Sequence, residues 1–301
     1  MRTAIVIAMA VFAGIVHAQI KVRDDTGHEV ALSAPARRIV SLAPHATELA
    51  FAAGAGDRIV GAVRGSNHPA AARAIRLVGD VHALDLERIV ALKPDLIITW
   101  PYTTPAQVTK LKDRGFAVFT TDPASIDGIA TNIERLGMLA GRGEVAAEAA
   151  AGFRAEVAKA TTRATSRAGS RPVRVFYQIW GTPLFTIGST HLITQAVRAC
   201  GGENVFSTVA IPAPQVSVEA VIAARPDTII AGTDRATKPV WLDDWNRWSD
   251  LPAVRDRLLQ VVDADRLHRP GPRFASGMGE LCEAIERARK TIVVVPAKVT
   301  R

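Results

Sequence analysis

Cysteine and aromatic residues are scarce in this sequence of 301 residues, which contains two cysteines and 5% aromatic residues. Several catalytic motifs are missing: we find no Gly-x-Ser-x-Gly, no glycine-rich phosphate loop and no His-Glu-x-x-His. Asp263 and Asp265 are neighbours, but two nearby acids alone do not indicate acid–base catalysis. Histidines at the tight spacing of a metal site are missing as well. We therefore expect no enzyme, no resident cofactor and no metal centre.

Positive charge is in excess, but it is not concentrated. The formal net charge is +8, and the Arg and Lys residues are scattered among acids, without a basic stripe that carries interleaved aromatic residues. Nucleic-acid binding typically relies on such a stripe, so we exclude nucleic acid as a partner. The surplus remains compatible with attraction to an acidic membrane surface or to an anionic ligand.

A long apolar run is present only near the N-terminus. Residues 4–16 are apolar, Arg2 precedes them, and VHA at 16–18 has the small-x-small form of a signal peptidase site. The run is shorter than the roughly 20 residues that a membrane-spanning helix needs. We expect a signal peptide of residues 1–18, cleavage before Gln19 and export to the periplasm. No cysteine follows the cleavage site, so we expect no lipid anchor there.

The two cysteines, Cys200 and Cys282, both lie beyond the predicted cleavage site. In an exported protein an even pair is typical of a disulfide. In the chain-entropy account, a bridge over a loop of this length stabilises the fold by about 4 kcal/mol. Free or reactive thiols remain the alternative.

An internal repeat organises the chain. Residues 87–98, with the sequence ERIVALKPDLII, recur as EAVIAARPDTII at residues 219–230. Each copy predicts a short amphipathic helix, a Pro-Asp break and a buried strand. Such a repeat is typical of two similar lobes within one chain.

Alternating strand and helix patterns predict the fold class. Segments with helical spacing separate short apolar runs, an alternation typical of parallel sheets that are covered on both faces. We expect an α/β fold with two doubly wound parallel-sheet lobes and a ligand cleft between them. The runs that predict strands are residues 38–42, 58–63, 95–99, 116–120, 173–178, 228–231 and 259–262.

One segment has no strand pattern and predicts the connection between the lobes. Residues 125–166 are rich in Ala, Glu and Arg at helical spacing, and Gly141 and Gly143 divide them into two helices. The second helix would extend roughly 30 Å at 1.5 Å per residue, and a stiff connector of this kind predicts small lobe movements. The expected parts are an N-terminal lobe at 19–138, a connecting helix at 139–168 and a C-terminal lobe at 169–301.

Polar and aromatic side chains follow the predicted strands. Ligands bind beyond the carboxyl ends of the strands in open parallel sheets, so these side chains are candidates for a ligand site. Trp100 and Trp180 would suit a flat, amphipathic ligand because large rings contribute contact area with few rotamers to freeze. Alternatively, the tryptophans cap the sheets and the histidines make ordinary hydrogen bonds. The candidate ligand-binding residues are Pro44, His45, His68, Trp100, Tyr102, Trp180, Asp265, Arg266 and Arg273.

Glu87 and Glu219 occupy the same place in the two copies of the repeat. Each follows a good N-cap residue, Asp85 or Ser217, so an acid in the first helical turn could simply stabilise the helix dipole. That explanation accounts less well for a glutamate kept at matching positions of an otherwise diverged repeat. We interpret the pair as a docking surface for a two-fold partner.

Five segments of the sequence carry a resemblance to a known family. They are IVSLAP at 39–44 with Thr47 and Glu48, residues 86–100, CGGENVF at 200–206, PQVS at 214–217 and residues 272–282. These segments resemble the periplasmic cobalamin-binding proteins of vitamin B12 importers, which belong to the substrate-binding proteins with a helical linker. The first segment is shared with haem and siderophore binders of the same class.

The resemblance implies a protein that carries cobalamin or a related corrinoid to an ABC permease dimer with its ATPase subunits. It implies two lobes joined by one long helix, a disulfide between Cys200 and Cys282, and a ligand in the cleft. It also implies salt bridges from Glu87 and Glu219 to arginines on the two permease subunits. Trp100 falls at a position that contacts the corrin in that family. We expect the protein to be a monomer.

The sequence departs from the family pattern at several aromatic contact positions. Val81 and Ala213 stand where tryptophan is expected. Arg266 stands at or beside another such position, and His68 stands where tyrosine is expected. Trp180 would compensate in part, so the expected pocket is less aromatic and more basic than the family pattern.

A basic pocket keeps haem or a ferric siderophore as the alternative ligand within the same transporter class. The carboxylates of haem would pair with Arg266, Arg269 or Arg273. From other classes, an extracytoplasmic enzyme, a metal-cluster protein and a partner of a signalling ectodomain remain open. Two cysteines that bond to each other argue against a metal cluster.

Overall fold

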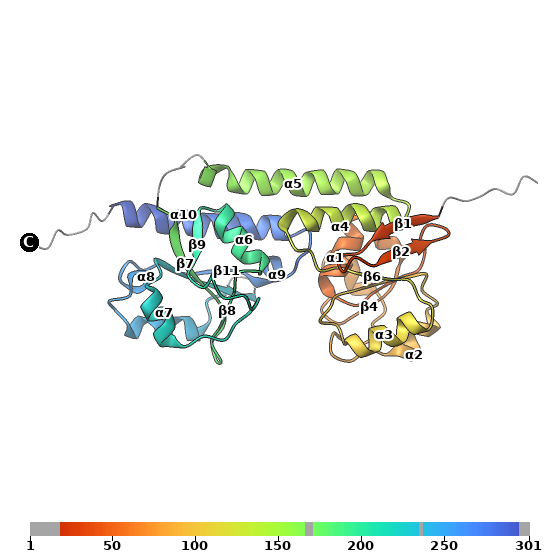
Figure 1. The fold of residues 1–301 in the computed structure, drawn as a ribbon, viewed down its shortest axis with the longest axis horizontal. Coiled ribbons are helices and arrows are strands. Elements are labelled where there is room, and N and C mark those ends of the chain that lie inside the picture. The colour runs from red at the N-terminus through yellow and green to blue at the C-terminus, as the bar shows by residue number, and fades with distance from the viewer. Residues whose placement is uncertain (1–18, 166–170, 235–236, 295–301) are drawn as a thin grey trace, which may run out of the picture.

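Two lobes lie side by side along a layer of long helices (Figure 1). The computed structural model describes residues 19–165, 171–234 and 237–294. The predicted signal peptide, residues 1–18, lies outside the described residues, as does the end of the predicted connecting helix, residues 166–168. Within the described part of the chain, every helix is too short or too polar to span a bilayer.

The N-terminal lobe contains a four-stranded parallel sheet in the order β4-β3-β5-β6. Its strands are β3 (Ile39–Ser41), β4 (Ile59–Ala62), β5 (Leu96–Thr99) and β6 (Val118–Thr120). Its helices are α1 (Pro44–Ala52), α2 (Leu86–Ala91), α3 (Pro105–Asp113) and α4 (Ile126–Leu139), with 3-10 turns at Gly56–Arg58 and Ala70–Ala74. Side chains alternate along a strand, so Leu96 belongs to the same apolar cluster as Leu49 of α1, while Ile97 belongs to the cluster that contains Ile89 of α2. Helices therefore cover both faces of the sheet.

The C-terminal lobe has the same plan with two additional short strands. Strands β11, β10 and β7 are parallel, β9 pairs parallel with β7, and β8 pairs antiparallel with β7. The strands are β7 (Val173–Trp180), β8 (Phe185–Thr186), β9 (Gly202–Asn204), β10 (Thr228–Thr233) and β11 (Leu259–Asp263). The helices are α6 (Leu192–Ala199), α7 (Val218–Ala224), α8 (Pro252–Arg255), α9 (Ala264–Leu267) and α10 (Phe274–Val294), with a 3-10 helix at Val240–Arg247.

Both faces of this second sheet are covered as well. Ile230 of β10 packs in the same cluster as Leu281 of α10, whereas Ile229 packs with Val221 of α7 on the opposite face. The predicted fold class, an α/β protein with two doubly wound lobes, is confirmed.

An antiparallel hairpin that the sequence analysis did not predict begins the described chain. Strands β1 (Ile20–Arg23) and β2 (Glu29–Leu32) pair around Gly27, whose φ of +81° favours glycine. Asp25 holds the hairpin on the lobe: its carboxylate accepts the backbone N–H of Asp122 at 2.6 Å and pairs with Arg135 at 2.8 Å.

Helix α5 (Gly143–Thr165) runs along both lobes (Figure 1). It packs against α4 of the N-terminal lobe and against α10 of the C-terminal lobe. Gly137 allows a close approach of α4 to α5, because a Cβ at this position would lie 2.1 Å from the Cβ of Ala146. A helix packed on both lobes suits a stiff connector, and the domain boundaries around 139–168 stay a prediction.

The two copies of the repeat fold alike at their Pro-Asp breaks. Asp95 accepts the backbone N–H of Arg38 at 2.9 Å, and Asp227 accepts the backbone N–H of Arg174 at 2.8 Å. Each carboxylate thus fixes the beginning of a neighbouring strand, β3 in one lobe and β7 in the other. The sequence repeat therefore corresponds to equivalent structure in the two lobes.

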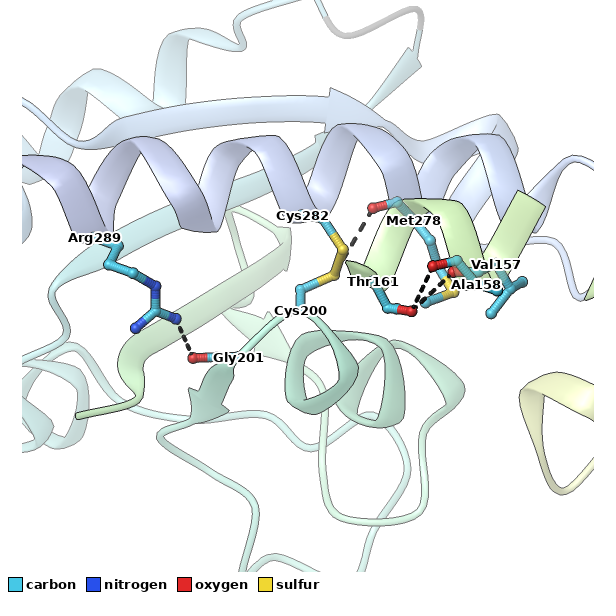
Figure 2. The surroundings of a disulfide bond; sticks show 8 residues. All are labelled: Val157, Ala158, Thr161, Cys200, Gly201, Met278, Cys282 and Arg289. Carbon is cyan, nitrogen blue, oxygen red and sulfur yellow. Dashed lines mark hydrogen bonds between the residues drawn. A yellow bond between two sulfur atoms is a disulfide. The ribbon is translucent and has the colours of Figure 1, made fainter. Parts of the chain in front are cut away.

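A disulfide joins Cys200, at the end of α6, to Cys282 in α10 (Figure 2). Beside it, Arg289 of α10 donates to the carbonyl oxygen of Gly201 at 2.6 Å. The predicted disulfide is confirmed, and it holds the closing helix against its lobe.

Candidate functional site

A cavity of about 560 Å³ opens between the lobes, where the carboxyl ends of their strands meet. Its walls come from segments far apart in the sequence: the loops after β5 and β6 on one side, and the start of α6, the loop at 212–213 and the end of α9 on the other. The side chains that give it its chemical character are Trp100, Tyr102, Asp122, His191, Ala213 and His268.

A second cavity of about 570 Å³ lies between α5 and α10, beside the disulfide. It is far from the strand ends, and its described lining includes Glu156, Lys159 and Glu283 but no aromatic side chain. Ligand cavities are typically apolar and aromatic with a few polar groups. The cavity between the lobes is therefore the better candidate site for a flat ligand.

Trp100 is the centre of an aromatic cluster on the wall from the N-terminal lobe. It follows β5, and its ring makes edge contacts with His45 at 5.1 Å and with Tyr102 at 4.7 Å between ring centroids. Tyr102 is 64% exposed, so its ring has a free face. Edge-to-face contacts of this kind hold the rings in place and leave an apolar surface toward the cavity.

The pKa of His45 is strongly perturbed. The side chain is buried, and its Nε2 has no hydrogen-bond partner among the described residues. Burial, and secondly the charge of Arg269, lower the pKa of His45 to about 3. The imidazole is therefore neutral at neutral pH.

The wall from the C-terminal lobe carries two more neutral imidazoles. His191 is the N-cap of α6, and its Nδ1 accepts the backbone N–H of Ile193 at 3.1 Å. His268 lies 3.0 Å from the hydroxyl of the fully buried Tyr177 through Nε2. Burial lowers the pKa of both histidines to about 4; His268 opposes protonation of His191, whereas Asp265 partly counteracts the shift of His268.

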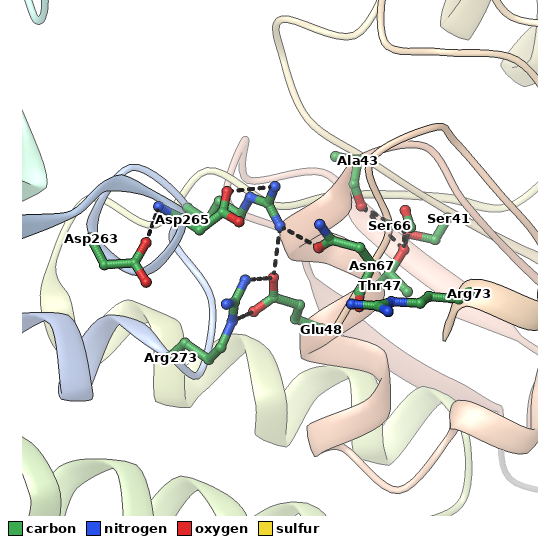
Figure 3. Close-up of polar contacts among 11 residues, drawn as sticks. Ser41, Ala43, Thr47, Glu48, Ser66, Asn67, Arg73, Asp263, Asp265 and Arg273 are labelled. Carbon is green, nitrogen blue, oxygen red and sulfur yellow. Dashed lines mark hydrogen bonds and ion pairs between the residues drawn. The ribbon is translucent and has the colours of Figure 1, made fainter. Parts of the chain in front are cut away.

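An ion-pair cluster connects the two lobes beside the cavity (Figure 3). Glu48 of α1 has a side chain that is 1% exposed, and it accepts two hydrogen bonds from Arg273, at 2.9 and 2.6 Å. Arg269 adds a bond of 3.3 Å to Glu48, and it also contacts Asn67 at 3.0 Å and Asp265 at 2.8 Å. Because Glu48 and Asn67 belong to the N-terminal lobe, this cluster links the lobes directly.

The predicted ligand residues Asp265, Arg266 and Arg273 are all engaged by neighbouring charges. Arg273 binds Glu48, and Asp265 pairs with Arg269. Arg266 pairs with Glu280 at 2.6 Å and with Asp263 at 3.3 Å. Their guanidinium and carboxylate groups thus hold the lobes and the end of β11 together, and they do not line the cavity.

The remaining candidates are spread around the cleft. Trp100 and Tyr102 line the cavity, and His45 supports Trp100 from behind. Pro44 is the first residue of α1, and His68 is exposed at the end of a loop before Pro69. Trp180, at the end of β7, is 60% exposed and does not line the cavity.

The two repeat glutamates are exposed on equivalent helices. Glu87 lies in the first turn of α2, after the N-cap Asp85, and Glu219 in the first turn of α7, after the N-cap Ser217. Figure 1 shows α2 and α7 on the side of the lobes that faces away from α5. Within the described part of the chain, neither glutamate forms an ion pair with a basic side chain.

Sequence reasoning missed three groups that shape this site: His191, Tyr177 with His268, and Glu48. His191 had a signal, because it directly precedes a helical pattern and could have been considered as a cap. The contact between His268 and Tyr177 had no local signal, because the two residues are 91 positions apart. Glu48 pairs with residues that are more than 200 positions away, and no local pattern indicates such a contact.

Acidification is expected to destabilise the protein because of the buried His45. Its pKa is about 3 in the folded state and 6.5 ordinarily, so only the unfolded chain binds a proton between these values. The contribution of the neutral His45 to the free energy of unfolding is therefore fully present above pH 6.5. Below that pH it falls by about 1.4 kcal/mol per pH unit. Urea unfolding at pH 7 and pH 5 should show a loss of about 2 kcal/mol or more, since His191 and His268 add to the effect.

The variant His45→Gln is the control for this prediction. Its free energy of unfolding should fall less steeply between pH 7 and pH 5, with a slope that is smaller by about 1.4 kcal/mol per pH unit, the value for one bound proton. Equal slopes in the two proteins would contradict the role assigned to His45.

Two parallel-sheet lobes, a bridging helix and a cavity between the lobes define a two-lobed ligand-binding protein. The chain belongs to the periplasmic binding protein family, whose sequence pattern matches residues 39–265. It is 35% identical to a vitamin B12-binding protein of Vibrio campbellii, over 85% of this chain and 92% of the relative. A vitamin B12-binding protein of Yersinia pestis is 34% identical, over 82% and 86% of the two chains.

Solved structures share the fold over most of their length. The periplasmic vitamin B12 binding protein BtuF of Vibrio cholerae matches with a TM-score of 0.76 and 35% identity, over 85% of this chain and 99% of that one. The periplasmic haem-binding protein RhuT of Roseiflexus matches with a TM-score of 0.73 and 27% identity, over 84% and 98%. The predicted family resemblance is thereby confirmed.

Proposed function

We propose that this protein captures cobalamin or a related corrinoid in the periplasm and delivers it to an ABC import permease, without chemistry of its own. The observation that carries the proposal is the cavity between the lobes, which presents aromatic rings on one wall and neutral polar groups on the other. A corrin is flat and amphipathic, with an apolar face and amide groups around its rim. The names of relatives that are 35% identical over most of the chain support the same ligand.

In this proposal Trp100 and Tyr102 contact the corrin. The ligand is cargo and not a cofactor, so it is held by contacts that can be released. Pro44, His68 and Trp180 remain candidate contacts at the rim of the cleft, and the buried His45 would act through Trp100, which it supports. Asp265, Arg266 and Arg273 would position this rim through their ion pairs.

Glu87 and Glu219 would dock the protein on its transporter. A permease dimer with its ATPase subunits presents two equivalent surfaces, and one monomer of this protein presents two equivalent glutamates, on α2 and α7. Each carboxylate would pair with an arginine of one permease subunit.

Haem is the second candidate ligand, because a haem-binding protein shares the fold at 27% identity. Haem carries two carboxylates, which arginine binds well. The arginines near the cavity are, however, already paired with Glu48, Asp265, Asp263 and Glu280. This arrangement favours a corrinoid over haem.

Calorimetric titration of the protein with cyanocobalamin, with hemin in parallel, tests the proposal. We expect one-to-one binding of cyanocobalamin, and about tenfold or more weaker binding by the variant Trp100→Ala, because the ring contact is lost. The control Val240→Ala changes a side chain that is 87% exposed and outside the cavity lining, and it should bind normally. Binding of hemin alone, with a Soret band, would replace the corrinoid with haem in the same architecture.

A further inference from the structure

The wall of the cavity that comes from the C-terminal lobe offers hydrogen-bond donors but no positive charge. On this wall His191 and His268 carry the imidazole nitrogens, and no Lys or Arg is among the described residues that line the cavity. Asp122 lines the opposite wall. The protonation pattern of the two histidines therefore decides which ligand groups the wall can bind.

The structure fixes the tautomer of His191. Its Nδ1 accepts the backbone N–H of Ile193 at 3.1 Å, so this nitrogen carries the lone pair. A neutral imidazole has one N–H and one lone pair, and the proton must therefore reside on Nε2. His191 Nε2 has no hydrogen-bond partner among the described residues, yet it is not fully buried. Because His191 lines the cavity, we take this N–H to be available to a ligand there.

The tautomer of His268 follows from Tyr177. The phenol is fully buried, its only described hydroxyl partner is His268 Nε2 at 3.0 Å, and burial raises its pKa further above the ordinary value. A buried hydroxyl that does not donate costs about 1–3 kcal/mol, so Tyr177 donates to Nε2, and Nδ1 carries the proton of the ring.

Gly232 of β10 makes room for this pair. A Cβ at position 232 would lie 2.4 Å from the hydroxyl oxygen of Tyr177 and 2.5 Å from His268 Nε2. The contact between Tyr177 and His268 thus depends on a glycine in a neighbouring strand. His268 Nδ1 has no hydrogen-bond partner among the described residues and is not fully buried. Because His268 also lines the cavity, we take its N–H to be available to a ligand as well.

We infer that His191 and His268 form a pair of neutral hydrogen-bond donors that recognise amide carbonyl oxygens on the rim of the ligand, while Asp122, with no Lys or Arg among the described lining residues, disfavours carboxylate-bearing tetrapyrroles. This inference rests on the proposed function, because it requires a corrinoid in this cavity. The two lone pairs are used inside the protein, so neither ring is free to ligate the metal of a tetrapyrrole. The carboxylate of Asp122 on the other wall would repel a carboxylate of the ligand and accept from an amide N–H.

Binding of two related probes tests the selection. The first is cyanocobalamin, whose rim carries amides, and the second is dicyanocobyrinic acid, in which the amides are carboxylates. His191→Ser removes the ring donor and keeps an N-cap, because serine is a good cap. The double variant Tyr177→Phe/His268→Phe removes the second donor without leaving an unpaired hydroxyl.

Each variant should bind cyanocobalamin about 3- to 10-fold more weakly than the unchanged protein, as expected for one lost hydrogen bond. The unchanged protein should bind dicyanocobyrinic acid more weakly than cyanocobalamin, because Asp122 repels its carboxylates and no Lys or Arg among the described lining residues compensates. Thermal unfolding shows whether each variant is folded. Undiminished cyanocobalamin binding by both variants would overturn the donor assignment alone, whereas no corrinoid binding by the unchanged protein would overturn the proposed function.

The tautomers can be measured without any ligand. Nitrogen-15 NMR of the imidazoles distinguishes the protonated nitrogen from the one that carries the lone pair. We expect the proton on Nε2 of His191 and on Nδ1 of His268. A proton on Nδ1 of His191, or on Nε2 of His268, would overturn the assignment for that residue.

Discussion

The variant Glu48→Ala should lose about 3–5 kcal/mol of its free energy of unfolding, the range expected when one partner of a buried ion pair is removed. The carboxylate is 1% exposed and is bound by Arg273 and Arg269, whose side chains are 21% and 20% exposed. Its removal leaves Arg273 without its carboxylate partner in a partly dry site, while Arg269 keeps only its pair with Asp265. Urea unfolding followed by circular dichroism measures this loss, and high salt should change it little because the pair is buried.

An exposed pair supplies the matched control. Lys21 and Glu29 form an ion pair in which both side chains are about half exposed, at 53% and 50%. Pairs of this kind contribute little because water already solvates the charges, so Glu29→Ala should unfold at nearly the same urea concentration as the unchanged protein. If Glu48→Ala behaved like Glu29→Ala, the cluster would not be the link between the lobes that we describe.

The double variant Glu87→Lys/Glu219→Lys should lose nearly all stimulation of the transporter's ATPase and still bind its ligand with unchanged affinity. In the proposed docking, each substitution would replace an attractive contact with arginine by a like-charge contact, and like charges across an interface cost several kcal/mol. The two positions lie on α2 and α7, outside the cavity between the lobes. ATPase assays in liposomes with the permease, together with calorimetric titration, measure the two effects separately.

Glu148→Lys/Glu156→Lys makes the same change of charge on α5, on the opposite side of the molecule. Both of these side chains are exposed, so this control should stimulate the transporter normally. Loss of stimulation in the control would indicate a general effect of charge and not docking at α2 and α7. Parallel loss of ligand binding and stimulation in the Glu87/Glu219 variant would contradict a pure docking role.

The elements of both lobes could be predicted because their signals are local. The strand predicted at residues 95–99 contains a continuous apolar run at 96–98, which is typical of a strand buried on both faces. The caps Asp85 and Ser217 were recognisable because short polar side chains precede apolar helical turns. The hairpin formed by β1 and β2 was missed, since its strands are four residues each and only one side of each is buried.

The site was predicted less completely than the fold. Trp100 was found because it ends a strand, and parallel strands bring such residues to one edge. Arg273 was assigned to the ligand from its position alone, but its charge is bound by a glutamate on another lobe. Ion pairs form between residues that are close in the folded structure, whatever their distance in the sequence. The partner of Arg273 lies 225 positions earlier in the chain.

This separation of 225 positions also determines when the ion pair can form during synthesis of the protein. Ribosomes release the N-terminal lobe first, so α1 exists long before α10 has been made. Glu48 stays hydrated until its partners Arg269 and Arg273, which follow it by 221 and 225 positions, have been synthesised. Closing a loop of this length costs about 5 kcal/mol of chain entropy, and the packing of α5 along α4 shortens the remaining search. The contacts of Glu48 with Arg269 and Arg273 can therefore form only after both arginines have been synthesised, and a truncated chain that ends before Arg269 would keep an uncompensated acid on its N-terminal lobe.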